Sequence, residues 1–213
     1  MLLAEDVLLL ATDDDTGKKQ SRYTDLLVAG GLLSDLALAG NVRVTEPGES
    51  VRKNRVVSVP DAPWPTDPLL ADALTVINEK PKWFASMLVE RLSRKLVDVV
   101  YQRLARAELV SRTPHRVLGL VPTTRWVSVD GRHENELRTQ LDEVFLFGVE
   151  PDPHTAALAA LLAGSDLLVP VIGRGRSVDR RALKRRGKEM LKQYWPAQAM
   201  ETAFQSRDGA AAG

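Results

Sequence analysis

Hydrophobic positions recur with the period of an α-helix along most of the chain, and two segments near its start are the most apolar. In residues 3–10, leucine and valine fall on one helical face. In residues 24–39, apolar side chains surround almost the whole helix, which is typical of a buried helix. We expect the rest of the chain to be organised around these two helices, and Gly30 and Gly31 to let another backbone come close.

Start and stop signals mark further amphipathic helices. Asp67-Pro68 and Asp152-Pro153 each place a capping residue before a proline at the first helical position. Another apolar stripe covers residues 134–147 and ends at a glycine. The longest helical pattern covers residues 82–110, and we expect one continuous helix there.

Short runs of β-prone residues interrupt the helical patterns. Two short strands are predicted, at residues 42–44 and 56–59. Residues 117–129 predict a β-hairpin with its turn at residues 122–125. Two interpretations stay open for this hairpin. It is either an ordinary structural hairpin or a membrane contact made by Val121, Arg125 and Trp126, because tryptophan is favoured at membrane interfaces.

Composition narrows the chemistry that the chain can perform. It has 213 residues, a formal net charge of +1 and no cysteine. The charge favours no class of partner, and the lack of cysteine excludes disulfides, thiolate metal sites and cysteine nucleophiles. No apolar run approaches the roughly 18 residues that span a bilayer, and the acidic start at Glu5 and Asp6 does not match a signal peptide. We therefore expect any membrane contact to be peripheral.

No sequence motif for catalysis is found. The chain lacks a phosphate-binding loop, a dinucleotide-binding glycine motif and a nucleophile elbow. Its three histidines, His115, His133 and His154, are far apart, and none has metal-ligand spacing. Residues 13–15 are three aspartates, which we interpret as a solvated turn, because oxygen ligands for a divalent cation normally come from alternating positions. We predict a protein that is not an enzyme and that holds no cofactor or metal.

Two basic regions are candidates for binding anions. Arg91 and Arg94 lie one turn apart in the long helical pattern. They either belong to a solvated basic face or hold an anion together. Residues 173–192 are strongly basic, with only Asp179 and Glu189 as acids. A solvated face is the default interpretation there, and an anionic lipid surface or nucleic acid are the alternatives.

Four stretches, in the same order, resemble the Golgi phosphoprotein 3 family. They are residues 5–17 (EDVLLLATDDDTG) with residues 29–44 (AGGLLSDLALAGNVRV), residues 65–74 (PTDPLLADAL), Trp83 with the helix to Val110, and residues 151–162 (PDPHTAALAALL). The resemblance extends to about Leu168. It implies a mainly α fold, in which an apolar helix bundle is wrapped by amphipathic helices and carries a small β-hairpin. We assign residues 1–207 to one such domain and the Gly/Ala-rich residues 208–213 to a disordered tail.

The resemblance also implies a function. Eukaryotic members of this family are peripheral proteins of the Golgi that bind phosphatidylinositol 4-phosphate in a basic pocket and grip the short cytosolic tails of glycosyltransferases. Carried over by position, the headgroup site falls at Tyr23 and Arg94, with Arg91 or Arg22 as the second arginine. The leading hypothesis is therefore a cytoplasmic adaptor at a membrane surface that binds anionic phospholipid.

Two positions depart from the family pattern. Ala29 stands where the family has an arginine, and Val97 stands near the second member of its arginine pair. An arginine lost from a phosphate site costs about 1.5–3 kcal/mol per charged hydrogen bond. These departures favour the alternative hypothesis, a soluble protein-interaction module that has lost the lipid site. We expect no nucleic-acid partner, and a protein partner and self-association stay open.

Overall fold

The two apolar helices near the start of the chain form the centre of the molecule. The computed structural model describes residues 1–49, 53–79, 83–117 and 121–212. Helix α1 (Leu3–Leu10) packs against α2 (Thr24–Leu38), and most of their side chains are buried. A Cβ atom at Gly31 would lie only 2.8 Å from the Cα of Ala4. Glycine at position 31 therefore lets the two backbones meet, as expected from the sequence, whereas Gly30 packs against the side chains of Leu161 and Met200.

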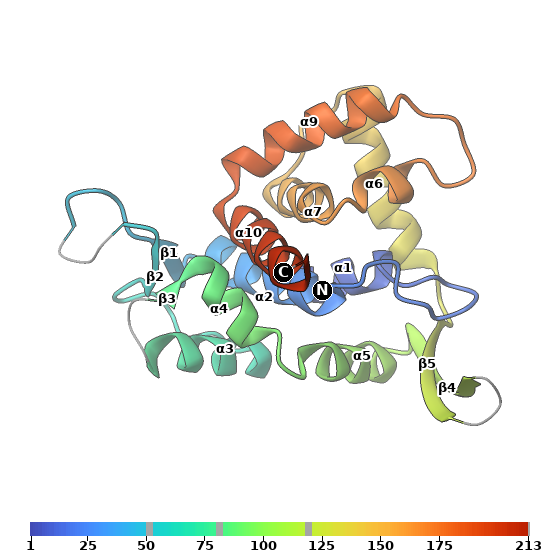
Figure 1. Cartoon of the computed structure of the whole chain (residues 1–213), viewed down its shortest axis with the longest axis horizontal. Coiled ribbons are helices and arrows are strands. Elements are labelled where there is room, and N and C mark those ends of the chain that lie inside the picture. Colours follow the sequence, from blue (N-terminus) through green and yellow to red (C-terminus); the bar gives the residue numbers. More distant parts are fainter. Residues whose placement is uncertain (50–52, 80–82, 118–120, 213) are drawn as a thin grey trace.

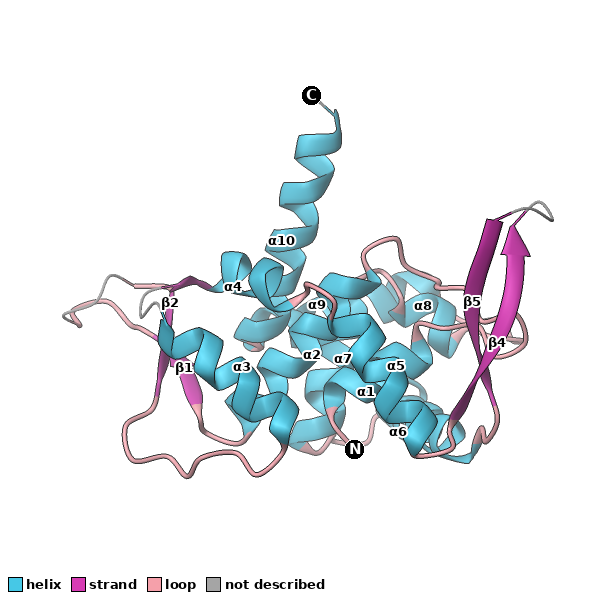
Figure 2. Ribbon diagram, turned by 90° about the horizontal axis from the view of Figure 1, so that it is seen from below, coloured by secondary structure: helices cyan, strands magenta, loops and turns pink. Residues whose placement is uncertain are grey.

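Eight further helices within the described ranges surround this pair (Figure 1). Along one side lie α3 (Pro68–Glu79), α4 (Ala85–Leu92) and α5 (Leu96–Arg106). Along the other side lie α6 (Arg132–Phe147), α7 (Pro153–Gly164), α8 (Leu168–Ile172) and α9 (Arg180–Gln193). Helix α10 (Trp195–Ala212) packs on α2, and its C-terminal end projects from the body (Figure 2). The mainly α bundle predicted from the sequence is confirmed.

Two small antiparallel sheets lie at opposite ends of the bundle (Figure 2). The first has the order β1 (Val42–Val44), β2 (Arg55–Ser58), β3 (Trp83–Phe84). The second is a hairpin of β4 (Val110–Val117) and β5 (Val121–Ser128), with Val110 opposite Ser128 and Val117 opposite Val121. The hairpin was predicted, but the turn expected at residues 122–125 is wrong, because these residues pair within β5. A two-stranded ribbon has only edge strands, which tolerate the prolines that indicated a turn.

The single helix expected over residues 82–110 is also wrong. Trp83 belongs to β3, and the helix is broken between α4 and α5, where Lys95 adopts a left-handed conformation with φ of 61°. Leu92 and Leu96 are buried on either side of the break. The apolar period therefore continues across the break, and periodicity alone could not reveal it.

The ends of several helices follow the sequence signals closely. The carboxylate of Asp152 accepts hydrogen bonds from the backbone N–H groups of His154 and Thr155, which caps α7 as predicted. At the other end of the chain, α10 continues to Ala212, where a disordered tail was expected from residue 208. Alanine is the strongest helix former, so the alanines of this tail extend the helix. No described helix has both the length and the apolar character that crossing a bilayer requires.

Candidate functional site

A groove of about 690 Å³ opens between α4, the start of α5 and the C-terminal part of α10. Charged side chains dominate its lining. The cationic ones are Lys19, Arg91, Arg94, Lys95 and Arg207. The acidic ones are Asp25, Glu90 and Asp98. We call this feature the groove, and its chemistry depends on which of these charges already have partners.

Arg207 is fully paired within the protein. Its Nε and Nη2 atoms donate to the two carboxylate oxygens of Glu90 at 2.7 and 2.6 Å, and Nη1 donates to Asp25 at 2.8 Å. The hydrogen bonds to Glu90, more than any other contact, raise the pKa of this guanidinium further. Charge-assisted, bidentate contacts of this kind are the strong class of hydrogen bond. Arg207 therefore joins α10 to α2 and α4, and its single positive charge is shared by two of the three acids in the groove.

The remaining cations of the groove are unmatched. Across the parts of the chain that the structure describes, no carboxylate lies within ion-pair distance of Lys19, Arg91, Arg94 or Lys95. Asp98 is the acid of the lining that Arg207 does not contact, and the five cations of the lining exceed its three acids by two positive charges. A concave surface with such an excess of positive charge attracts anions from solution.

The break between α4 and α5 places these cations. The Ser93 hydroxyl donates to the carbonyl of Glu90 at 3.0 Å, and the left-handed Lys95 then starts α5 in a new direction. Arg94 and Lys95 consequently lie in the connection rather than on a helical face. The side chain of Lys95 does not cap α5, so the N-terminal end of this helix, with its partial positive charge, adds to the field in the groove.

The four residues that the resemblance implies for the headgroup site lie in two different places. Arg91 and Arg94 both line the groove. Arg22 instead pairs with Asp208 of α10, and the Tyr23 hydroxyl donates to the same carboxylate at 2.8 Å. This hydrogen bond is the main cause that raises the pKa of Tyr23. Two of the four side chains are thus in the groove, and two are held by the end of α10.

The positions that depart from the family pattern have different surroundings. Ala29 is completely buried in α2 and contributes to the apolar core. Val97 lines the groove but presents no charge to it. Neither position can supply the phosphate contact that an arginine would make. Any anion bound in the groove is therefore held from α4, the α4–α5 connection and Lys19.

The three hairpin residues that were predicted to contact a membrane have different surroundings in the structure. The ring of Trp126 stacks on Tyr101, with centroids 5.1 Å apart and an angle of 9° between the rings. Gly17 packs on the backbone of Trp126, where a Cβ atom would be 2.7 Å from its carbonyl oxygen. Trp126 and the half-buried Arg125 lie in the half of β5 that ends at the bundle, so Trp126 packs against the protein itself. The side chain of Val121 lies outside the described residues, and its membrane contact stays a prediction.

In the acidic turn, residues 13–17, two of the three aspartates have partners within the protein. An oxygen of the Asp13 carboxylate accepts from the backbone N–H of Thr16 at 2.8 Å and from its hydroxyl at 2.6 Å. The side-chain hydrogen bond is the main cause that lowers the pKa of Asp13. Asp14 pairs with Arg174 at 2.8 Å. In the described part of the chain, no group of three histidine or carboxylate side chains is arranged to hold a metal ion.

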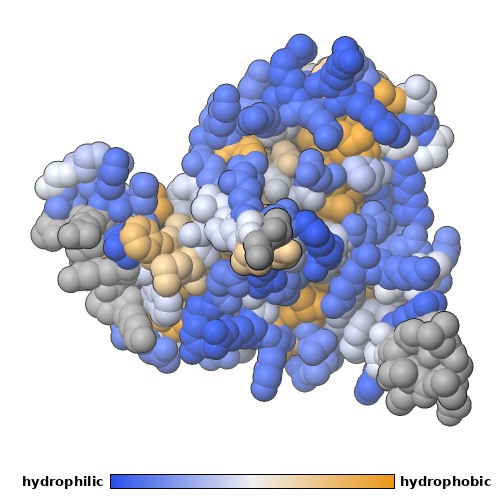
Figure 3. Space-filling model, viewed as in Figure 1, coloured by the Kyte–Doolittle hydropathy of each residue, from blue (hydrophilic) through white to orange (hydrophobic). Residues whose placement is uncertain are grey.

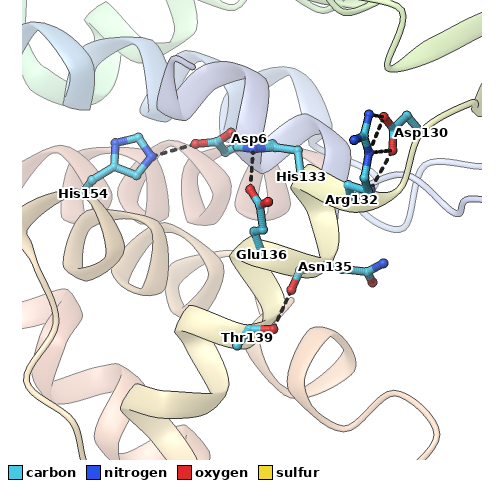
Figure 4. Close-up of polar contacts among 8 residues, drawn as sticks. All are labelled: Asp6, Asp130, Arg132, His133, Asn135, Glu136, Thr139 and His154. Atoms are coloured by element: carbon cyan, nitrogen blue, oxygen red, sulfur yellow. Dashed lines mark hydrogen bonds and ion pairs between the residues drawn. The ribbon is translucent and has the colours of Figure 1, made fainter.

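A second polar cluster, which the sequence did not reveal, surrounds Asp6 of α1 (Figure 4). This carboxylate is 1% exposed. Nε2 of His133 on α6 lies 2.7 Å from one of its oxygens, and Nε2 of His154 on α7 lies 2.6 Å from the other. The hydrogen bond to Asp6 raises the pKa of His154. Glu136 lies 3.8 Å from the other ring nitrogen of His133. The cluster connects α1 to two outer helices.

Asp35 of α2 extends this network to the first turn of α1. Its carboxylate accepts from the backbone N–H groups of Leu3 and Ala4 at 2.9 and 3.3 Å, which satisfies two donors that a helix start leaves free. Burial raises the pKa of Asp35 to about 7. The sequence shows the acidic residues at the start of α1, but the two histidines that contact Asp6 lie more than 100 positions further along the chain. We call Asp6, Asp35, His133 and His154 the Asp6 network.

Nearly the whole chain is similar to a known protein family. A family model described as Golgi phosphoprotein 3 matches residues 3–207. The match covers the central helices, the groove and the Asp6 network, so both features lie within the family domain. A comparison with curated proteins returned no match.

Proposed function

The chain belongs to the Golgi phosphoprotein 3 family, and from this premise we propose that it is a peripheral membrane protein that binds anionic phospholipid headgroups in the groove. It acts by binding and not by catalysis. It works at the cytoplasmic surface of a membrane. Phosphatidylinositol 4-phosphate is the first lipid to test, because the family resemblance implies it.

One observation carries the proposal: Lys19, Arg91, Arg94 and Lys95 line the same groove without acidic partners among the described residues. A volume of about 690 Å³ lies in the range of small-ligand sites, which is about 300–1,000 Å³. Arginine forms paired, charge-assisted hydrogen bonds with phosphate oxygens. A phosphorylated headgroup supplies the negative charge that the protein itself does not.

The test is sedimentation with lipid vesicles. The protein is mixed with vesicles of phosphatidylcholine alone, with added phosphatidylglycerol, or with added phosphatidylinositol 4-phosphate, each at low and at physiological salt. Each cation near an anionic membrane contributes about 1 kcal/mol, so Arg91→Ala combined with Arg94→Ala should weaken binding by roughly 30-fold. The matched control is Lys188→Ala combined with Lys192→Ala, which removes two exposed cations of α9.

The outcomes separate the two basic regions. Loss of binding in the groove variant alone supports the proposal, and preference for the phosphoinositide would identify the headgroup. Equal loss in the α9 variant would assign binding to the basic residues 173–192 instead. Equal binding to neutral and acidic vesicles would contradict the proposal.

A second candidate function, a protein-interaction module without a lipid site, is favoured by one observation. Arg22 and Tyr23, two of the four side chains expected at the headgroup, contact Asp208 of α10. A module of this kind would bind a protein partner in a stable complex that vesicles do not displace. Absence of binding to every vesicle at low salt, together with such a complex, would establish it.

A further inference from the structure

Two large apolar side chains are exposed beside the groove. Phe84, at the end of β3, is 46% exposed, and Met87, in the first turn of α4, is 55% exposed. Phe84 has an extended backbone and directly precedes α4, so the two side chains are close in sequence at the start of this helix. Met87 also lines the groove. In Figure 3, an apolar patch lies over the region of β3 and α4 among hydrophilic atoms.

Cationic side chains border this apolar site. Arg91 follows Met87 by one helical turn and lines the same groove. On the other side, the guanidinium carbon of Arg55 lies 3.3 Å from the centroid of the Phe84 ring. The surface therefore passes from apolar at Phe84 and Met87 to basic at Arg91 and Arg94. Exposed apolar side chains next to basic ones are typical of segments that lie in the interface of an anionic membrane.

We propose that Phe84 and Met87 insert into the membrane at the edge of the groove while the groove holds a headgroup. The inference rests on the proposed function and adds the side chains that anchor the protein. A membrane fits this surface because it presents anionic groups above an apolar layer, in the order in which the protein presents cations and apolar side chains. Transfer of exposed apolar area out of water then strengthens the contact.

Phe147 supplies a matched control. It is 76% exposed at the end of α6, so its side chain is at least as available as Met87. Helix α6 lies on the opposite side of α1 and α2 from α4 and α5 (Figure 1). A membrane that covers the groove should not reach Phe147. A difference between positions 87 and 147 therefore reports orientation and not exposure.

The first arm of the experiment uses a single fluorescent label. The chain has no cysteine, so Met87→Cys and Phe147→Cys each give one labelling site for an environment-sensitive dye. Vesicles of phosphatidylcholine with phosphatidylinositol 4-phosphate are added to each labelled protein. We expect a shift of emission to shorter wavelength at position 87 and none at position 147.

The second arm separates insertion from headgroup binding. Phe84→Ser is tested by vesicle sedimentation and, in parallel, by calorimetry with soluble inositol 1,4-bisphosphate. We expect this variant to weaken vesicle binding by about tenfold, since the aromatic ring no longer leaves water when the protein meets the membrane. Binding of the soluble headgroup should stay unchanged, because Phe84 is not part of the groove lining, and Phe147→Ser should leave both measurements unchanged.

Each result has one consequence. If the unsubstituted protein binds these vesicles but the label at position 87 shows no shift, the insertion is overturned and the proposed function stands. If Phe84→Ser weakens binding of the soluble headgroup as much as binding to vesicles, Phe84 acts through headgroup binding and the insertion is overturned. If the unsubstituted protein binds neither vesicles nor the soluble headgroup, the proposed function fails, and the insertion fails with it.

Discussion

The Asp6 network and the groove use the same kinds of charged side chain, but they differ in how the charges are matched. In the network, a carboxylate that is 1% exposed has an imidazole on each oxygen, at 2.7 and 2.6 Å. In the groove, Arg91 and Arg94 have no acidic partner among the described residues, although Arg207 nearby has two. The first arrangement is complete within the chain, and the second leaves positive charges that, under the proposed function, an anion from outside would match.

This difference separates stability from binding. A buried charge without a partner is costly, so a network deep in the bundle must be closed for the chain to fold. Charges at the mouth of a groove keep their water and can stay unmatched at little cost to the folded state. The same substitution of a charged residue should therefore act on unfolding at one place and on ligand binding at the other.

The largest effect is expected for Asp6→Ala. The substitution removes the acceptor for two imidazoles and the link between α1, α6 and α7. Removing one partner of a buried charged pair costs about 3–5 kcal/mol, and the half-exposed histidines place the expected loss near the lower end, at about 3 kcal/mol. Urea unfolding measures it. Asp15→Ala, at an exposed aspartate, is the control, and equal midpoints for the two variants would contradict the closed network.

The second prediction concerns pH. The pKa of His154 is raised by its bond to Asp6, so its contribution to the free energy of unfolding is complete below about pH 6.5 and is lost as pH rises through the folded-state pKa. The pKa of Asp35 is raised by burial from 3.8 to about 7, so the folded state keeps a proton that the unfolded chain has released, and stability again falls with rising pH. We expect the urea midpoint to decrease between about pH 5 and pH 8.

His154→Gln tests the source of this pH dependence. Glutamine keeps an N–H donor for Asp6 but does not titrate, so the decrease above about pH 6.5 should become smaller. An unchanged slope would assign the pH dependence to Asp35 or to other groups.

A smaller effect is expected for Asp208→Ala. The substitution releases Arg22 and Tyr23, which face the end of α10, and alanine keeps the helix intact. If Arg22 can then reach a headgroup, vesicle binding should strengthen by about fivefold, which corresponds to about 1 kcal/mol per arginine near the membrane. Gln205→Ala, at an exposed position of the same helix, is the control. Unchanged affinity would place Arg22 and Tyr23 outside the headgroup site.

The smallest effect should be on the stability of the groove variant. Arg91→Ala combined with Arg94→Ala removes no ion pair, so the free energy of unfolding should change by less than about 0.5 kcal/mol. The same variant is expected to bind vesicles about 30-fold more weakly. A loss of stability as large as that of Asp6→Ala would show that Arg91 and Arg94 are already paired within the protein.

Much of the fold could be predicted from short-range patterns in the sequence. The cap at Asp152, the close approach at Gly31 and the burial of α2 each depend on residues a few positions apart or on one helical face. The break at Lys95 was missed because the apolar spacing continues through it. The position of the turn in the hairpin was missed because prolines occur in its edge strands.

Less of the candidate site than of the fold could be predicted from the sequence. Arg91 and Arg94 were found because they are close in sequence, and both line the groove. The contacts of Arg207 with Asp25 and Glu90 were not predicted, because Arg207 is the last residue before the tail expected to be disordered, and its partners lie far away in the sequence. The contact between Asp6 and His154 spans 148 positions, and only the tertiary structure brings such residues together.

The left-handed conformation of Lys95 has a consequence for engineering the protein. A residue with a Cβ atom is strained at a φ of 61°, and glycine there would relieve roughly 1 kcal/mol. A search for thermostable variants would therefore select Lys95→Gly early. The same change would remove one of the four unmatched cations and soften the connection that carries Arg94. At this one backbone position, the expected heat resistance and the proposed lipid binding compete.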